Sequence, residues 1–168
     1  LHPDNPITVA PQVNEDWLME IRRQSDEAMH RSVAVIEEAY ADFKKTFNRG
    51  DPSPFIEEYM TEDAEIIIVG MGTLALPVRV AIRRMREAGK KIGFVRVKFF
   101  RPFPTEELRQ VLGGRKAVCV VDRDYSFGSP SFAGVLFHEL RSALYSLENR
   151  PMMLNFIAGL GGREVHVN

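Results

Sequence analysis

The chain has 168 residues, of which 45% are hydrophobic and 27% are charged, a composition typical of a folded domain and not of a disordered segment. Its 22 basic and 23 acidic residues give a formal net charge of −1, which excludes the strongly basic balance expected of a nucleic-acid-binding protein. The single cysteine, Cys119, excludes an internal disulfide and an iron–sulfur cluster held by four cysteines of this chain.

No apolar run approaches the ~20 residues that span a bilayer, and no signal peptide is recognisable, so we expect a cytoplasmic protein with neither membrane nor nucleic acid as a partner. Because the chain begins at Leu1 and not at a methionine, we expect a piece of a longer protein.

Two segments precede the main domain. Residues 1–13 contain three prolines and are expected to form an extended linker. Residues 14–50 are expected to hold a long helix from about Asn14, its N-cap, to Phe47. One apolar stripe repeats along it at spacings of four and three: Met29, Val33, Ile36, Tyr40, Phe43 and Phe47. The stripe indicates a helix that packs across the domain or on a partner subunit, with a coiled coil as the alternative.

Residues 51–168 alternate between short β-branched runs and amphipathic helical segments. The expected strands cover residues 55–60, 65–70, 92–97, 117–121 and 153–157, and the expected helices cover 73–87, 104–112 and 132–145. Thr73 is the expected cap of the first of these helices. The alternation predicts a three-layer α/β/α domain with a mostly parallel sheet.

Polar residues and glycines follow the ends of the predicted strands, which meet at one edge of such a sheet and are where ligands or partners bind. The candidate residues of this edge are Gly70, Gly72, Thr73, Arg101, Asp122, Arg123, Ser126 and Gly128. The spacing Gly70-x-Gly72-x-x-Ala75 fits either a dinucleotide-binding turn or a plain tight turn. Arg101 could bind a carboxylate or phosphate, or it could pair with Asp122 or Asp124 within the fold. We identify no catalytic set and no metal site, which indicates a non-catalytic domain of a larger enzyme.

Five ordered strings, at residues 57–65 (EEYMTEDAE), 70–73 (GMGT), 100–104 (FRPFP), 122–128 (DRDYSFG) and 155–164 (NFIAGLGGRE), resemble a known family. They are similar to the second domain of the alpha chain of pyruvate:ferredoxin oxidoreductase and related 2-oxoacid oxidoreductases. Residues 2–8 (HPDNPIT) resemble the linker before that domain.

The resemblance implies a fold like the C-terminal domain of transketolases, with five strands in the order 1-3-2-4-5 and an antiparallel first strand. It implies a parent complex that converts a 2-oxoacid, with pyruvate as the default, to an acyl-CoA and reduces ferredoxin. Thiamine diphosphate with magnesium, and iron–sulfur clusters, would be the cofactors of that complex. This chain lacks the family's Gly-Asp-Gly diphosphate motif and its cluster cysteines, so it would bind no cofactor itself.

The expected role is assembly with the other domains and subunits, with ferredoxin reached through the complex and a homodimer as one option. A self-sufficient nucleotide- or CoA-binding module that uses residues 70–73 is the alternative function.

Overall fold

The computed structural model describes residues 2–7, 9–10 and 12–167, and five of its strands form a single sheet in the order β1-β3-β2-β4-β5. The strands are β1 (Ile56–Tyr59), β2 (Ile66–Met71), β3 (Ile92–Val97), β4 (Ala117–Asp122) and β5 (Met152–Ile157). The edge strand β1 runs antiparallel to β3, and the remaining neighbours are parallel. The expected strand order and the antiparallel first strand are therefore confirmed.

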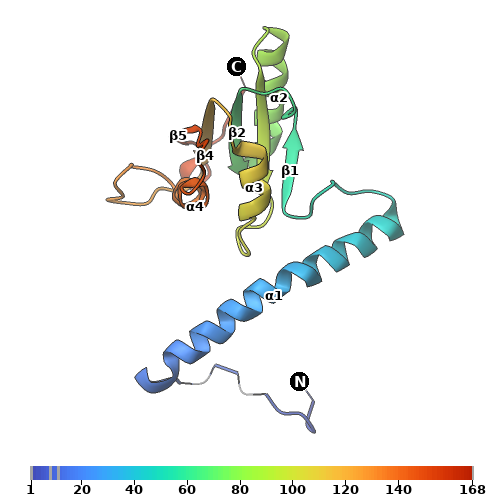
Figure 1. Ribbon diagram of the computed structural model, residues 1–168, viewed down its shortest axis with the longest axis vertical. Coiled ribbons are helices and arrows are strands. Elements are labelled where there is room, and N and C mark those ends of the chain that lie inside the picture. Colours follow the sequence, from blue (N-terminus) through green and yellow to red (C-terminus); the bar gives the residue numbers. More distant parts are fainter. Residues whose placement is uncertain (1, 8, 11, 168) are drawn as a thin grey trace.

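The helices of the α/β body lie on both faces of this sheet (Figure 1). They are α2 (Ala75–Glu87), α3 (Thr105–Leu112) and α4 (Val135–Leu144). α3 and α4 contact each other and cover one face, where the main core gathers fully buried Ile67, Val69, Val118 and Val120. Because successive strand residues point to opposite faces, the intervening residues face α2.

The layer formed by α2 is narrow. α2 packs on β3, where Ile82 and Phe94 are fully buried. Leu154 and Phe156 on the edge strand β5 remain 40% and 52% exposed. The expected three layers are therefore present. On the face of the sheet opposite to α3 and α4, α2 covers mainly β2 and β3.

Two local expectations are wrong, and a third, Asn14 as the N-cap of the long helix, is confirmed in position only. A short 3₁₀ turn, η1 (Gly72–Leu74), precedes α2, and the hydroxyl of Thr73 does not cap the helix. The last helix begins at Val135 and not at residue 132, because Phe132 has a φ of +48° and Gly134 is extended. Asn14 occupies the N-cap position of the long helix, but its side chain binds Asp16 instead of the helix backbone.

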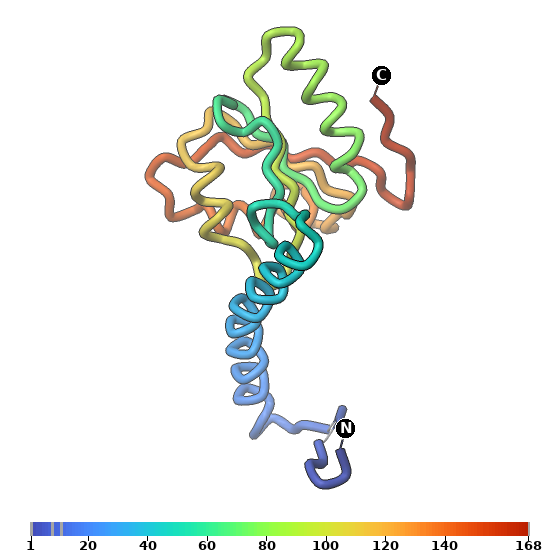
Figure 2. The backbone as a smooth tube through the Cα atoms, turned by 90° about the vertical axis from the view of Figure 1, so that its right-hand side faces the viewer, coloured from blue at the N-terminus to red at the C-terminus, as the bar shows by residue number. Residues whose placement is uncertain are grey.

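The long helix α1 (Glu15–Phe47) projects beyond the α/β body (Figures 1 and 2). Val33 and Ile36, in its middle, pack against the main core. Residues 14–31 are all exposed, as is Phe47 at the other end, so the body covers only part of the expected stripe. No helix of the described residues is long and apolar enough to cross a membrane. Leu1, Thr8 and Pro11 of the expected linker lie outside the described residues.

Lys98 joins the C-terminal half of α1 to the sheet. Lys98 directly follows β3. Its Nζ donates to Asp51 Oδ2 at 2.9 Å and to the Ser53 carbonyl at 2.6 Å. The same ammonium lies over the ring of Tyr40, whose hydroxyl accepts from the Asp51 amide at 2.7 Å. These contacts fix the connection between α1 and β1, because Lys98 is largely buried and its charge is neutralised by Asp51.

Gly134 provides a test of the packing between β4 and α4. A Cβ at this position would overlap the carboxyl group of Asp122, whereas a Cβ at Gly70 would meet its neighbours at ordinary contact distance. We therefore expect Gly134→Ala to lower the free energy of unfolding by about 2 kcal/mol. Gly70→Ala, the matched control, should change it by less than about 1 kcal/mol. Urea denaturation followed by circular dichroism measures both, and equal effects would contradict this description of the packing.

Candidate functional site

Arg123, the first residue after β4, ties three strand ends together. Its Nη1 donates to the hydroxyl of Thr73 after β2 at 2.6 Å. Its Nε and Nη2 both point to the carbonyl of Gly159 after β5, at 3.4 Å. Gly159 has a φ of +74°, and a Cβ there would crowd the guanidinium at 3.0 Å from Nε, so glycine suits this position on both counts. We call these contacts of Arg123 with Thr73 and Gly159 the clamp. It brings together two of the candidate residues, Thr73 and Arg123.

Asp122 and Asp124 bind the first turn of α4. The Asp122 carboxylate accepts from the Phe137 amide at 3.1 Å, and that of Asp124 accepts from the Val135 amide at 3.0 Å. These amides lack partners inside the helix, and a negative charge is favourable at this end of the helix dipole. Both carboxylates therefore act as caps, contributed from the last residue of β4 and from the loop that follows it.

The pKa of Asp122 is strongly perturbed. Its pKa is raised to about 6, mainly because the side chain is almost fully buried, and the hydrogen bond from Phe137 partly opposes the rise. The neighbouring charge of Asp124 also contributes to this rise. A raised carboxyl pKa can mark a catalytic acid, but here the group faces a helix terminus and serves packing.

Arg101 does not pair with Asp122 or Asp124, as one expectation had it. Its Nη2 donates to Oε1 of Glu139 on α4 at 2.6 Å, and its Nη1 donates to the Phe100 carbonyl at 2.7 Å. The guanidinium also lies 4.4 Å from the centre of the Phe100 ring. Arg101 thus holds the loop after β3 against α4, apart from the clamp formed by Arg123.

Ser126 and Gly128 lie on the loop between β4 and α4, which projects from the body (Figure 1). The loop is closed by a hydrogen bond from the Ser126 amide to the Ala133 carbonyl, at 3.0 Å. At its surface Phe127 is 87% exposed and Phe132 is 71% exposed. Sequence reasoning missed both phenylalanines, although three aromatic residues in one short loop, Tyr125, Phe127 and Phe132, were the available signal.

The glycine turn after β2 has the backbone of a tight turn. Gly70 lies within β2, and Gly72 has a φ of +63° at the start of η1. The nearby recess, of about 320 Å³, is lined partly by Thr73, Arg123 and the tail segment 162–166. The Thr73 hydroxyl accepts from Arg123 and is thereby held within the fold.

The residues present do not fit the cofactors implied by the resemblance. Among the residues described, no group of three or more His, Cys, Asp or Glu side chains is placed to hold a metal ion. Asp122 and Asp124 direct oxygens at helix amides and not into a cavity. Burial raises the pKa of Cys119 within β4, which disfavours the thiolate that a cluster requires. We therefore derive no chemical step through thiamine diphosphate, magnesium or iron–sulfur clusters at this edge.

The raised pKa of Asp122 gives a pH-dependent test. Between pH 4 and 6 the folded chain keeps a proton that the unfolded chain, with its ordinary pKa of 3.8, has lost. The free energy of unfolding therefore falls as the pH rises through this window, by on the order of 3 kcal/mol. Asp122→Asn retains an acceptor for Phe137 and removes the titration, so the stability of the variant relative to the parent chain should grow from pH 4 to 6 and then level off. Urea unfolding at half-unit pH steps measures this difference, and a constant difference would contradict the assignment.

The chain is similar to a group of oxidoreductase subunits. It is 38% identical over 165 residues to pyruvate synthase subunit PorA of Thermotoga maritima, and 40% identical over 168 residues to PorA of Pyrococcus abyssi. It is also 38% identical over 165 residues to ketoisovalerate oxidoreductase subunit VorA of Pyrococcus abyssi. These alignments cover 98%, 100% and 98% of this chain and 41% of each relative, so the chain spans about two fifths of the length of these relatives.

A solved structure shares the fold. The 2-oxoglutarate:ferredoxin oxidoreductase from Magnetococcus marinus, determined with 2-oxoglutarate, coenzyme A and succinyl-CoA bound, matches with a TM-score of 0.50 and 21% identity. The match covers 90% of this chain and 22% of that one. The family model described as pyruvate:ferredoxin oxidoreductase core domain II matches residues 64–168, more than half of the chain. The chain therefore belongs to the family of pyruvate:ferredoxin oxidoreductase core domain II.

Proposed function

We propose that this chain is a non-catalytic assembly domain in the alpha subunit of a 2-oxoacid:ferredoxin oxidoreductase. The parent complex would oxidise a 2-oxoacid, with pyruvate as the default substrate, form an acyl-CoA and pass electrons to ferredoxin. Thiamine diphosphate, magnesium and iron–sulfur clusters would be bound by its other domains and subunits. The relatives support this class of reaction, because they include both pyruvate synthase and ketoisovalerate oxidoreductase subunits.

The assembly role rests on one observation about the edge of the sheet where the parallel strands end, the strand-end edge. The polar side chains at this edge are bound by other groups of the same chain. The guanidinium groups of Arg101 and Arg123 and the carboxylates of Asp122 and Asp124 all bind partners within the fold. Groups that are already paired inside the fold serve to hold segments together, as buried and half-buried polar groups do in most proteins. The edge is therefore suited to hold a loop in a fixed shape.

The loop between β4 and α4 is the part of this edge that suits a contact with another domain or subunit. The Ser129 hydroxyl accepts from the Ala133 amide at 3.2 Å, and the rings of Tyr125 and Phe127 lie 5.0 Å apart. These contacts order the loop while Phe127 and Phe132 remain exposed. Exposed aromatic side chains on an ordered loop are favourable anchors, because little conformational entropy is lost when they bind.

Phe127→Ser in the complete enzyme tests this role. We expect the fraction of fully assembled complex to fall about tenfold, because the loss of one buried aromatic anchor costs more than ~1 kcal/mol at an interface. Turnover per assembled complex should stay unchanged. The matched control is Tyr145→Ser, an exposed aromatic at the C-terminal end of α4, whereas the loop leads into the N-terminal end of this helix. Size-exclusion chromatography and activity assays of the same fractions measure both quantities. Normal assembly together with reduced turnover per complex would contradict a scaffold role.

The alternative nucleotide- or CoA-binding module is tested with the chain alone. NAD, NADP and CoA are each added at up to millimolar concentration in a thermal-shift experiment, and we expect no change in Tm. A ligand at 100 times its Kd would add about 2.7 kcal/mol to the free energy of unfolding, which the measurement resolves easily. A saturable shift that Thr73→Val or Arg123→Ala removes would contradict the proposed role and favour the alternative.

A further inference from the structure

The N-terminal half of α1 carries an apolar stripe that the α/β body does not cover. Trp17 is 64% exposed, and Leu18 and Ile21 are 47% and 37% exposed. At 3.6 residues per turn these side chains share one face with Ala28 and Ser32. The stripe continues into Val33 and Ile36, where the contact with the main core begins. The uncovered stripe therefore comprises the face between Trp17 and Ser32.

We propose that this stripe pairs with the same stripe of a second copy of the chain, with the two helices antiparallel. A two-fold axis between Gln24 and Ser25 places the uncovered half of each helix along that of the other. The pairing goes beyond the assembly role proposed above, and it uses only residues of this chain, so it can fail or succeed independently of that role.

The shape of the stripe is complementary to itself about this axis. Trp17 comes level with Ser32 of the partner, and Ile21 comes level with Ala28, so a large side chain faces a small one at each level. Alternation of large and small residues allows two helices to approach closely without voids. The crossing point itself carries Ser25, a small residue that permits this approach.

The charges beside the stripe are also complementary. Glu20 and Arg31 lie on one flank of the stripe, and Arg22 and Asp26 lie on the other. In an antiparallel pair each flank meets the same flank of the partner. Glu20 then comes within two residues, about 3 Å, of the level of the partner's Arg31, and Arg22 comes within one residue, about 1.5 Å, of the level of the partner's Asp26. Flanking charges of this kind select partner and orientation in helix pairs.

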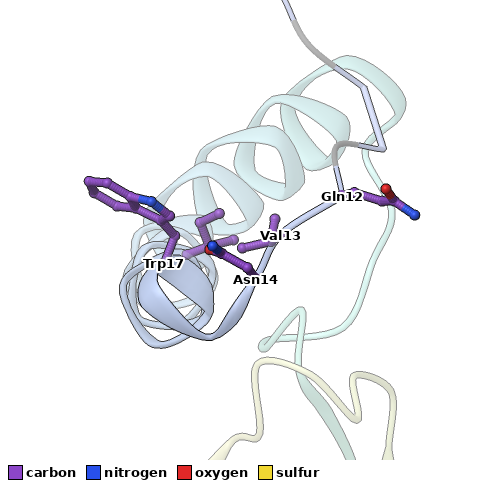
Figure 3. A pocket seen from close by; sticks show the side chains of 5 residues that line it. Gln12, Val13, Asn14 and Trp17 are labelled. Atoms are coloured by element: carbon purple, nitrogen blue, oxygen red, sulfur yellow. The ribbon is translucent and has the colours of Figure 1, made fainter.

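A recess at the start of α1 matches a projecting side chain in the same register. It is lined by Gln12, Val13, Asn14, Trp17 and Ile21, and Figure 3 shows Trp17 projecting from the helix away from the segment that carries Gln12. Val35 is 64% exposed on the same flank of the stripe as Trp17, and the proposed axis brings it level with Asn14 of the partner. A valine side chain that would otherwise face water thus meets the apolar side of this recess.

Sedimentation of the full 168-residue chain over a range of concentrations tests the pairing. We expect a reversible dimer of twice 19.1 kDa. Glu20→Arg and Arg31→Glu should each raise the dimer Kd about tenfold, since two symmetric pairs become repulsive. The double variant should restore the parent Kd. These residues are 11 positions apart, about 16 Å along one helix, so the rescue can arise only between two chains. Glu37→Arg, on the same helix but opposite the stripe, is the matched control and should leave the Kd unchanged.

Disulfide trapping gives an independent readout in a chain that carries Cys119→Ser. Ser25→Cys, beside the axis, should form a cross-linked dimer under mild oxidation, and Met19→Cys, on the opposite side of the helix, should not. Circular dichroism confirms folding of each variant. A monomer at all concentrations would overturn the proposal. A dimer whose Kd is unchanged by Glu20→Arg and by Arg31→Glu would overturn it as well. The first result would assign the stripe to other domains or subunits of the complete enzyme, and the second would place the dimer contact elsewhere, for example on the exposed face of β5.

Discussion

The burial of the Asp122 carboxylate against the first turn of α4 is the contact on which the strand-end edge depends. It requires glycine at position 134, because any Cβ there would overlap the carboxyl group. It also fixes where α4 begins, and thereby the shape of the loop that leads from Arg123 to Gly134. A charged group held in this way costs free energy at neutral pH, since burial raises its pKa. The structure tolerates this cost because the carboxylate supplies a helix end with the acceptor that it lacks.

The same edge supports the proposed assembly role. In parallel α/β sheets the strand ends are the usual place for ligands, and this chain places arginines, aspartates and glycines there. The side chains bind one another and the helix termini, and they connect segments that are distant in the sequence. What the edge presents outward is apolar: Phe127 and Phe132 on an ordered loop. With the uncovered stripe of α1, the chain has two surfaces suited to protein contacts.

Much of the fold could be predicted from the sequence, whereas the contacts of the site could not. The β-branched runs of β2 and β4 are local patterns, and so is the stripe between Met29 and Phe47 that was expected for α1. Residue spacing alone was therefore sufficient to place these elements. The strand order came from the resemblance to a family. Arg101 pairs with Glu139, 38 residues away, and Arg123 with Thr73, 50 residues away, and such pairs depend on how the crossovers place the helices. Thr73 is not the cap of α2 because it lies inside the 3₁₀ turn η1, which places Leu74 at the cap position, and its hydroxyl accepts from Arg123 instead.

The central claim is that the strand-end edge of this chain serves contacts between proteins and not chemistry. Hydrogen exchange measured by mass spectrometry, on the chain alone and within the complete enzyme, tests it most directly. If the claim holds, amides of the loop between β4 and α4 become protected only in the complete enzyme, and amides of β2 and β4 exchange equally slowly in both. Protection of the strand-end segments in the isolated chain on addition of a 2-oxoacid or CoA, with no change on assembly, would contradict it.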